Sequence, residues 1–183
     1  GLFSTEKAKT TAQAGITEAS STFVPKGAVV AKCGLATTTP GGPCVGAFEY
    51  VSEVVFQLTL AAGAEEASLE SAALAFVYTD DNQRHSYVQT VPLTDPTLFH
   101  TSTTDEIIRL VTISKIVGPS NDLLKKGEVA EIIVSLNGTR ATTTVVQLGK
   151  NSTFRIEVIP PTGGSLLLER KTPVALSPVM NLE

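Results

Sequence analysis

The sequence contains no Trp, only two Cys and one Met, and few aromatic residues of any kind. It also has no long apolar run. A transmembrane helix needs about 20 consecutive apolar residues, so no membrane-spanning helix is expected. The chain does not open with the charged and then apolar segments of a secretory signal. The sequence therefore predicts neither a membrane anchor nor a leader within these residues.

Excess positive charge is also missing. The formal net charge is −4 with a pI near 5.2, and no basic run is longer than Lys125-Lys126. Proteins that bind nucleic acid need a basic face to neutralise phosphates, and so do proteins that bind anionic membrane surfaces. We therefore expect no nucleic-acid partner and no membrane partner.

Catalytic motifs are absent as well. The chain has two His and lacks the Gly-x-Ser-x-Gly, His-Glu-x-x-His, P-loop and Gly-x-Gly-x-x-Gly patterns. The sequence therefore predicts no enzyme activity, no catalytic residues and no cofactor.

What remains is typical of a β-rich domain. Hydrophobic residues make up 42% of 183 residues, mostly Val, Ile, Leu and Ala, with Gly and Pro between the apolar runs. Phe154, Ile156 and Val158 alternate with Arg155 and Glu157, as in a half-buried strand. Many short strands without a βαβ rhythm favour an antiparallel β-sandwich or barrel of the Ig-like type. We expect strands at residues 28–32, 51–60, 74–79, 85–90, 107–114, 129–136, 142–148, 153–159 and 165–170.

One helix is predicted at the amino terminus, over residues 5–22. Ser4 or Thr5 can cap it, and small residues recur at helical spacing along one face. Pro25 and Gly27 are expected to end it. The predicted organisation is a helix in residues 1–22 followed by a β domain in residues 23–183.

The two cysteines, Cys33 and Cys44, flank a Gly-, Pro- and Thr-rich segment that cannot form a core. Such a pair suggests a disulfide that closes the loop in an oxidising compartment. The alternative is two free thiols. A zinc site is disfavoured because neither His is near in sequence.

A second candidate site is the acidic turn formed by Asp80, Asp81 and Asn82. Three oxygen donors in one turn could contribute to a Ca²⁺ site. The twelve-residue loop that would make this assignment specific is missing. The acidic turn is more readily explained as an Asx-rich turn between two strands, so no metal is assigned.

Several segments, in this order along the chain, resemble archaellins, the filament subunits of the archaeal motility organelle. The tail is similar to the archaellin ending Glu-Arg-Thr-Thr-Pro followed by Val-Met-Asp-Leu, with Lys171 in place of a Thr and Asn181 in place of an Asp. Residues around 68–120 match only in pattern. The matching segments are Gly-Leu-Phe-Ser-Thr-Glu-Lys-Ala-Lys at residues 1–9, Ala-Gly-Ile-Thr-Glu-Ala-Ser-Ser at 14–21, Lys-Gly-Ala-Val-Val-Ala-Lys at 26–32, and the tail at 169–182.

The resemblance implies a structural, extracellular subunit of the archaellum filament. Archaellin precursors carry a cleaved leader and a long apolar helix, so the chain is expected to be a truncated, soluble and monomeric form of the outer domain. In the filament its partners would be copies of itself or other archaellins. Two alternatives are an archaeal pilin or adhesion-filament subunit, and a secreted β-sandwich binding module such as a stator protein that grips the surface layer.

Two Asn-x-Ser/Thr sequons, at Asn137 and Asn151, are candidate N-glycosylation sites. Chance would supply about one sequon in a chain so rich in Ser and Thr. Both Asn residues also suit turns for backbone reasons. The resemblance to secreted archaeal surface proteins favours their modification.

Overall fold

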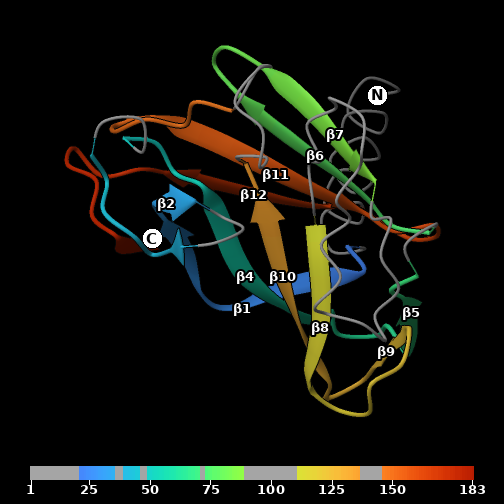
Figure 1. Ribbon diagram of the computed structural model, residues 1–183. Helices are drawn as coiled ribbons and strands as arrows, with labels where there is room; N and C mark the ends of the chain where they lie inside the picture. Colours follow the sequence, from blue (N-terminus) through green and yellow to red (C-terminus); the bar gives the residue numbers. More distant parts are fainter. Residues whose placement is uncertain (1–20, 36–38, 46–48, 71–72, 89–110, 137–145) are drawn as a thin grey trace, which may run out of the picture.

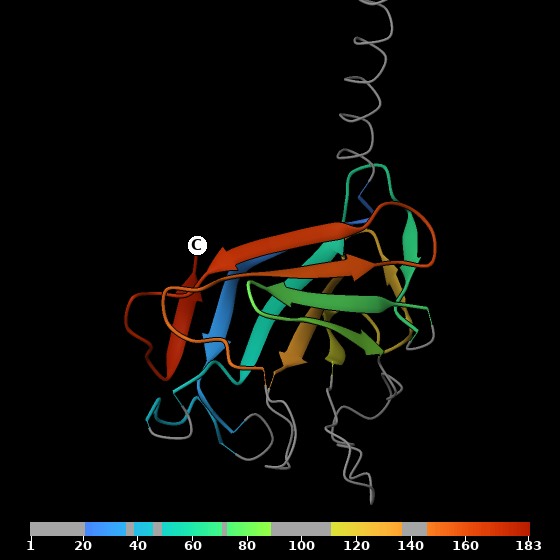
Figure 2. The ribbon, with the colours of Figure 1, turned by 90° about the horizontal axis from the view of Figure 1, so that it is seen from above.

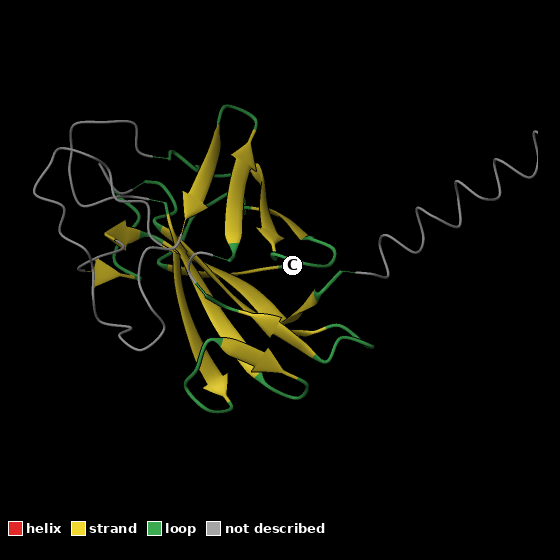
Figure 3. Cartoon of the chain, turned by 90° about the vertical axis from the view of Figure 1, so that its right-hand side faces the viewer, coloured by secondary structure: helices red, strands yellow, loops and turns green. Residues whose placement is uncertain are grey.

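The computed structural model describes residues 21–35, 39–45, 49–70, 73–88, 111–136 and 146–183. This part of the chain consists of strands and loops, with no helix among them (Figure 3). It therefore contains no helix that could cross a membrane. All pairings between named strands are antiparallel, which confirms the mainly β, antiparallel expectation.

The larger sheet has five strands in the order β13-β1-β4-β10-β8 (Figure 1). Alternate residues of β4 face the core, and Val54, Phe56 and Leu58 are fully or almost fully buried. This period of two is the one that the sequence predicts. The strands are β1 (Phe23–Lys32), β4 (Glu53–Leu60), β8 (Val111–Val117), β10 (Val129–Ser135) and β13 (Val179–Leu182).

The smaller sheet has four strands in the order β12-β11-β6-β7. Phe154, Ile156 and Val158 of β11 are each 0% exposed, as their alternation with charged residues predicts. Burial of such side chains contributes roughly 1.5–3 kcal/mol each. The strands are β6 (Ala75–Asp80), β7 (Arg84–Val88), β11 (Thr153–Ile159) and β12 (Leu166–Lys171).

The two sheets form two layers over one hydrophobic core (Figure 2). The core cluster joins Phe56 and Ile132 of the larger sheet to Phe76 and Phe154 of the smaller sheet. Tyr78 and Phe154 stack with their ring centroids 6.2 Å apart. Because one cluster spans both layers, neither sheet has a core of its own.

Two short antiparallel strand pairs lie outside these two sheets. One joins β5 (Glu66–Ser68) to β9 (Leu123–Lys125), and the other joins β2 (Gly34–Leu35) to β3 (Thr39–Pro40). The sequence analysis predicts none of the four strands, because two or three residues are too few to show alternation.

The amino-terminal predictions are only partly tested. Most of the predicted helix 5–22 lies outside the described residues, but Ser21 and Thr22 are not helical. Ser21 bridges to Gly164, and the Thr22 N–H donates to the Gly164 carbonyl at 3.0 Å. Pro25 and Gly27 both lie within β1. Pro25 is paired with Leu58 of β4, and Gly27 lies in the irregularity between Lys26 and Val30.

Most other strand predictions have counterparts within a few residues. The predicted strand 107–114 is described only from Val111 onward. The predicted strand 142–148 lies outside the described residues except at 146–148, where Leu148 forms a single bridge with Val51. β13 was not predicted, and it pairs with β1 so that the carboxyl terminus becomes an edge of the larger sheet.

Candidate functional site

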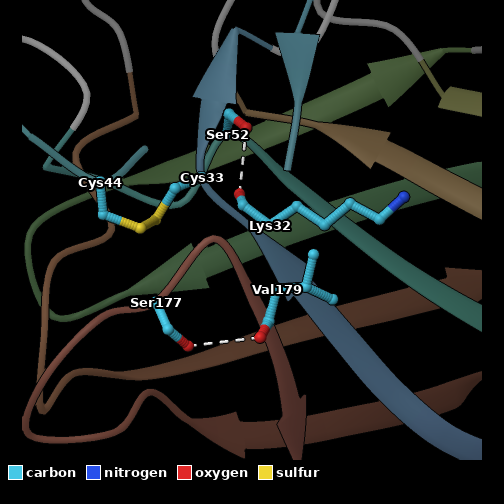
Figure 4. Close-up of a disulfide and its surroundings, with 6 residues drawn as sticks. All are labelled: Lys32, Cys33, Cys44, Ser52, Ser177 and Val179. Atoms are coloured by element: carbon cyan, nitrogen blue, oxygen red, sulfur yellow. Dashed lines mark hydrogen bonds between the residues drawn. A yellow bond between two sulfur atoms is a disulfide. The ribbon is translucent and has the colours of Figure 1, made fainter. Parts of the chain in front are cut away.

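Cys33 and Cys44 are joined by a disulfide, with their Cα atoms 5.3 Å apart (Figure 4). Cys33 is fully buried directly after β1, and it ties the loop to other segments. Its N–H donates to the Pro178 carbonyl at 3.0 Å, and its carbonyl accepts from the Gly41 N–H at 2.9 Å. The disulfide and these hydrogen bonds of Cys33 therefore connect Cys44 and Gly41 to both the sandwich and the carboxyl-terminal tail.

The Cys33–Cys44 disulfide lies at the end of the sandwich that we call the disulfide end. Glu53 of β4 and Ser135 of β10 are paired there. On the outer face of the same sheet Lys32 Nζ lies 3.1 Å from Glu53 Oε1, and the Glu53 side chain is only 6% exposed. This cross-strand ion pair covers the start of β4 and the end of β1 beside the disulfide.

A hollow of about 340 Å³ opens at the disulfide end. Its size falls in the range of ligand pockets, about 300–1,000 Å³. The lining is mostly apolar, with one acidic and one basic side chain. The residues around the hollow are Cys44, Glu49, Tyr50, Gly149, Lys150, Val174, Ala175 and Leu176.

Sequence reasoning missed this hollow because its walls come from four separate segments. Of the lining residues, only Cys44 is singled out by the sequence, as one half of the expected disulfide. Residues Val174–Leu176 form another wall and lie in the tail. The sequence of the tail indicates a family resemblance, but it does not indicate that these residues line a hollow. The tail is brought there because β13 pairs with β1, a contact between the two ends of the described chain.

Thr172 connects the tail to the turn that carries Asn151. The Thr172 side chain is 2% exposed, and its hydroxyl donates to the Gly149 carbonyl at 2.7 Å. The same oxygen accepts from the Ser152 N–H at 2.8 Å. Asn151 is exposed, and its φ of 53° is the only positive φ of a non-glycine residue in the described ranges.

Asn151 therefore occupies a rigid, solvent-facing turn, and its N–H donates to the Pro173 carbonyl at 2.9 Å. Asn tolerates the left-handed conformation better than most residues. The second sequon, at Asn137, lies outside the described residues.

In the acidic turn, the Asp80 carboxylate accepts hydrogen bonds from neighbouring residues of the same hairpin. Asp80 Oδ1 accepts from the N–H groups of Asn82 and Gln83, at 2.8 and 3.0 Å. Asp80 Oδ2 accepts from the Tyr78 hydroxyl at 2.7 Å and from Gln83 Nε2 at 3.2 Å. Partial burial raises the pKa of Asp80, but these hydrogen bonds outweigh it, and the net pKa lies below the ordinary value.

Asp81 and Asn82 are exposed beside Asp80. In the part of the chain that the structure describes, no group of three or more His, Cys, Asp or Glu side chains is placed to hold a metal ion. Asp80 thus acts as the acceptor of an Asx-type turn between β6 and β7.

At the opposite end of the sandwich a buried lysine organises the connection from β8 to β9. The Lys115 side chain is 1% exposed, and its Nζ lies 2.5 Å from Glu128 Oε2 and 2.7 Å from Asn121 Oδ1. The Lys125 N–H also donates to Glu128 Oε2 at 2.8 Å. The hydrogen bond from Lys115, aided by that from Lys125, holds the pKa of Glu128 below its ordinary value.

A family model and a curated relative of this chain both describe the same kind of protein. The family model described as archaeal-type flagellin matches residues 1–170. A probable flagellin of Archaeoglobus fulgidus is 29% identical over 187 aligned positions, which cover 100% of this chain and 80% of the relative.

Two solved structures are also similar. A crystal structure of an archaeal flagellin from Methanocaldococcus jannaschii aligns with a TM-score of 0.59 at 16% identity, covering 89% of this chain and 96% of the other. This alignment supports the fold. The archaeal flagellum of Methanospirillum hungatei aligns with a TM-score of 0.49 at 16% identity, covering 100% of this chain and 82% of the other.

Proposed function

The chain belongs to the archaeal-type flagellin family, and from that premise we propose that its β-sandwich forms the outer layer of a filament held together by helices. Members of this family are structural subunits of the archaeal motility filament, and this chain is one of them. The observation that carries this function is the family match across residues 1–170, which includes both the amino-terminal segment and nearly all of the sandwich.

In this proposal the amino-terminal segment and the β domain have different mechanical roles. The segment before Ser21 is proposed to continue an apolar helix that bundles with its copies, and burial of that apolar surface holds the filament together. Residues 23–183 form the shell around this bundle. Contacts between unlike surfaces of identical subunits generate an open helix, which is the symmetry a filament needs.

The outer layer of a filament must be stable, but it needs no catalytic residues. We propose that the chain has no enzymatic activity and needs no cofactor, and that its partners are copies of itself or other archaellins. A disulfide at Cys33 and Cys44 suits the extracellular side of the cell, where thiols are oxidised. Closing a loop of this length contributes roughly 3 kcal/mol in the chain-entropy account.

Asn151 is the better supported of the two proposed glycosylation sites. Its side chain is exposed, its turn is fixed by Thr172, and Ser152 and Thr153 complete the sequon. We propose that Asn137 and Asn151 both carry glycans in the native organism. Mass spectrometry of native filaments tests this: unmodified peptides at both positions would remove the proposal.

Deletion of the gene in its native host tests the function. We expect loss of the motility filament and of swimming, both restored by the wild-type gene. Immunogold electron microscopy with antibodies against residues 23–183 should label the filament along its length. A strain that swims normally but no longer attaches to surfaces would instead indicate an adhesion filament. Labelling confined to the cell envelope, with none on filaments, would indicate a stator-like module.

A further inference from the structure

An amine, a carboxamide and a carboxylate meet at the connection from β8 to β9. Lys115 Nζ lies 2.7 Å from Asn121 Oδ1 and 2.5 Å from Glu128 Oε2. The side chains of Lys115 and Glu128 are only 1% and 13% exposed. The lysine amine therefore contacts an amide and a group that can carry protons at the same time, and water is largely kept from the amine.

The fold holds both partners of the amine in place. Asn121 Oδ1 also accepts from the Leu123 N–H at 3.2 Å, and Glu128 Oε2 also accepts from the Lys125 N–H at 2.8 Å. Gly118 leaves room for the carboxyl group, because a Cβ added there would lie 2.7 Å from Glu128 Cδ. The three groups are therefore positioned relative to one another by backbone contacts and by a glycine.

The amide of Asn121 adds something that an ion pair does not need, namely a carbon that an amine can attack. This carbon is bonded to Oδ1 at about 1.2 Å. The hydrogen bonds to Oδ1 from Lys115 and Leu123 draw electron density from the carbonyl, as the donors of an oxyanion hole do. Reactants held in contact can reach effective concentrations of about 10⁵–10⁸ M, so an amide that is inert in water becomes reactive.

We propose that Lys115 and Asn121 join in an intramolecular isopeptide bond, with Glu128 as the group that moves the protons. Lys115 Nζ attacks Asn121 Cγ, so an N–C bond forms and the Cγ–Nδ2 bond breaks. Two protons pass from Nζ through the Glu128 carboxylate to Nδ2, which departs as ammonium. The carboxylate is regenerated, and the step needs no oxidant, reductant or added molecule. Asn121 is exposed, which gives the ammonium a path to solvent.

The charge state of the Lys115–Glu128 pair sets the expected rate. The hydrogen bond from Lys115 holds the pKa of Glu128 below its ordinary value, so the resting pair is an ammonium and a carboxylate. The amine can attack only after a proton has crossed the contact to Oε2. The bond should therefore form slowly, after folding. It forms once in each chain, which distinguishes it from turnover by an enzyme.

This modification goes beyond the proposed function, and it does not depend on filament assembly. It would tie β8 to the turn that leads into β9, at the end of the sandwich opposite the disulfide. An amide bond is not cut by thiols. The chain would therefore keep this second covalent link under conditions that reduce the Cys33–Cys44 disulfide.

Mass spectrometry of the purified full chain tests the bond, with the protein made in a host that adds no N-glycans. The folded chain is incubated below its unfolding midpoint, reduced and weighed. Its mass should be lower than the mass of the reduced sequence by one ammonia molecule. Trypsin should fail to cut after Lys115, because an acylated lysine is not a trypsin site. Fragmentation should place the loss in a single peptide that contains both Lys115 and Asn121.

Three variants separate the roles of the three groups. Lys115→Arg and Asn121→Ala each remove a reactant, so both should keep the full mass. Glu128→Gln keeps the size of the side chain but cannot relay the protons, so it should form the bond much more slowly. Lys126→Arg changes an exposed lysine nearby and should lose ammonia as the wild type does. Thermal unfolding followed by circular dichroism checks that each variant folds.

The wild-type result alone can overturn the proposal, whether or not the variants fold. Full mass after incubation, with tryptic cleavage after Lys115, would show that the three groups form only an ion pair and a hydrogen bond. A loss of ammonia that persists in Asn121→Ala would also overturn it, because the loss would then arise at another asparagine. Bond formation in Glu128→Gln at the wild-type rate would overturn the proton relay.

Discussion

Thr172 shows how one buried hydroxyl can hold two segments that the sequence separates. Its oxygen accepts from the Ser152 N–H and donates to the Gly149 carbonyl, and its own N–H donates to the Ser152 carbonyl at 2.9 Å. The residue belongs to the tail motif by which the sequence resembles archaellins. In the structure the role of that Thr is to fix the turn before β11.

The substitution Thr172→Val keeps the shape of the side chain and removes the hydrogen bonds of its hydroxyl to Ser152 and Gly149. The Ser152 N–H and the Gly149 carbonyl then lose their partner, which costs roughly 1–3 kcal/mol when the groups are buried. Thr172→Ser is the matched control, because it keeps the hydroxyl. Urea unfolding measures the difference, and equal midpoints for the Val and Ser variants would contradict this role.

Asp80 gives the chain a pH dependence whose sign follows from its hydrogen bonds. Its folded pKa lies below the ordinary value of 3.8, so the folded state favours the carboxylate. This contribution is fully present above the unfolded pKa and is lost as the pH falls through the folded pKa. The free energy of unfolding should therefore decline from about pH 5 toward pH 2.

Asp80→Asn should lower stability at neutral pH and flatten this acid decline. Asp81→Asn removes the same charge from the exposed neighbouring position, so it separates the effect of the hydrogen bonds from that of net charge. Urea midpoints measured across the acid range provide the comparison. An acid decline equally steep in Asp80→Asn and the wild type would assign the pH dependence to other carboxylates.

At the scale of elements, the hairpin of β11 and β12 shows what sequence reasoning captures well. Alternation at residues 154–158 predicts the first strand, and the Pro-Pro-Thr-Gly-Gly run at residues 160–164 indicates a turn before the strand expected at residues 165–170. Gly163 has a φ of 89° in this turn, and a Cβ there would come within 2.2 Å of Thr22 Oγ1. The hairpin turn thus lies against the segment where the chain enters β1.

Gly163→Ala should cost more than Gly63→Ala, although both glycines have a φ of 89°. A left-handed conformation costs an Ala roughly 1–2 kcal/mol at either position. At Gly63 nothing lies within 4 Å of the added Cβ, whereas at Gly163 Thr22 must also move. The difference between the two urea midpoints isolates that contact, and equal losses would show that Thr22 yields freely.

Other elements were beyond sequence reasoning for physical reasons. β13 has only four residues, Val179–Leu182, and its strand conformation depends on pairing with β1 about 150 residues earlier. Pro25 and Gly27 act as helix breakers in the sequence, yet tertiary pairing with β4 keeps both within β1. The pairing of Cys33 with Cys44 could be predicted because the chain has only two cysteines. The hollow could not be predicted from the sequence, because the segments that line it come together only when β13 pairs with β1.

At the scale of the whole molecule, one core serves both sheets. Leu58 and Ile132 come from the larger sheet and Phe76 and Ile156 from the smaller one, and all belong to a single buried cluster. A shell of this kind can transmit load between filament neighbours only if its layers do not separate. Shared burial is the physical basis for that rigidity, because separating the sheets would expose apolar surface on both.

The chain should therefore unfold in one cooperative transition, with equal calorimetric and van't Hoff enthalpies. Leu58→Ala in β4 and Ile156→Ala in β11 each remove a side chain that is 0% exposed, and each should cost about 2–5 kcal/mol. For a domain of this size such a loss lowers the midpoint by roughly 2–4 °C per kcal/mol. Because the core is shared, both variants should shift the same transition. If Leu58→Ala moved one calorimetric peak and Ile156→Ala another, the two sheets would be separate folding units, which the single shared core argues against.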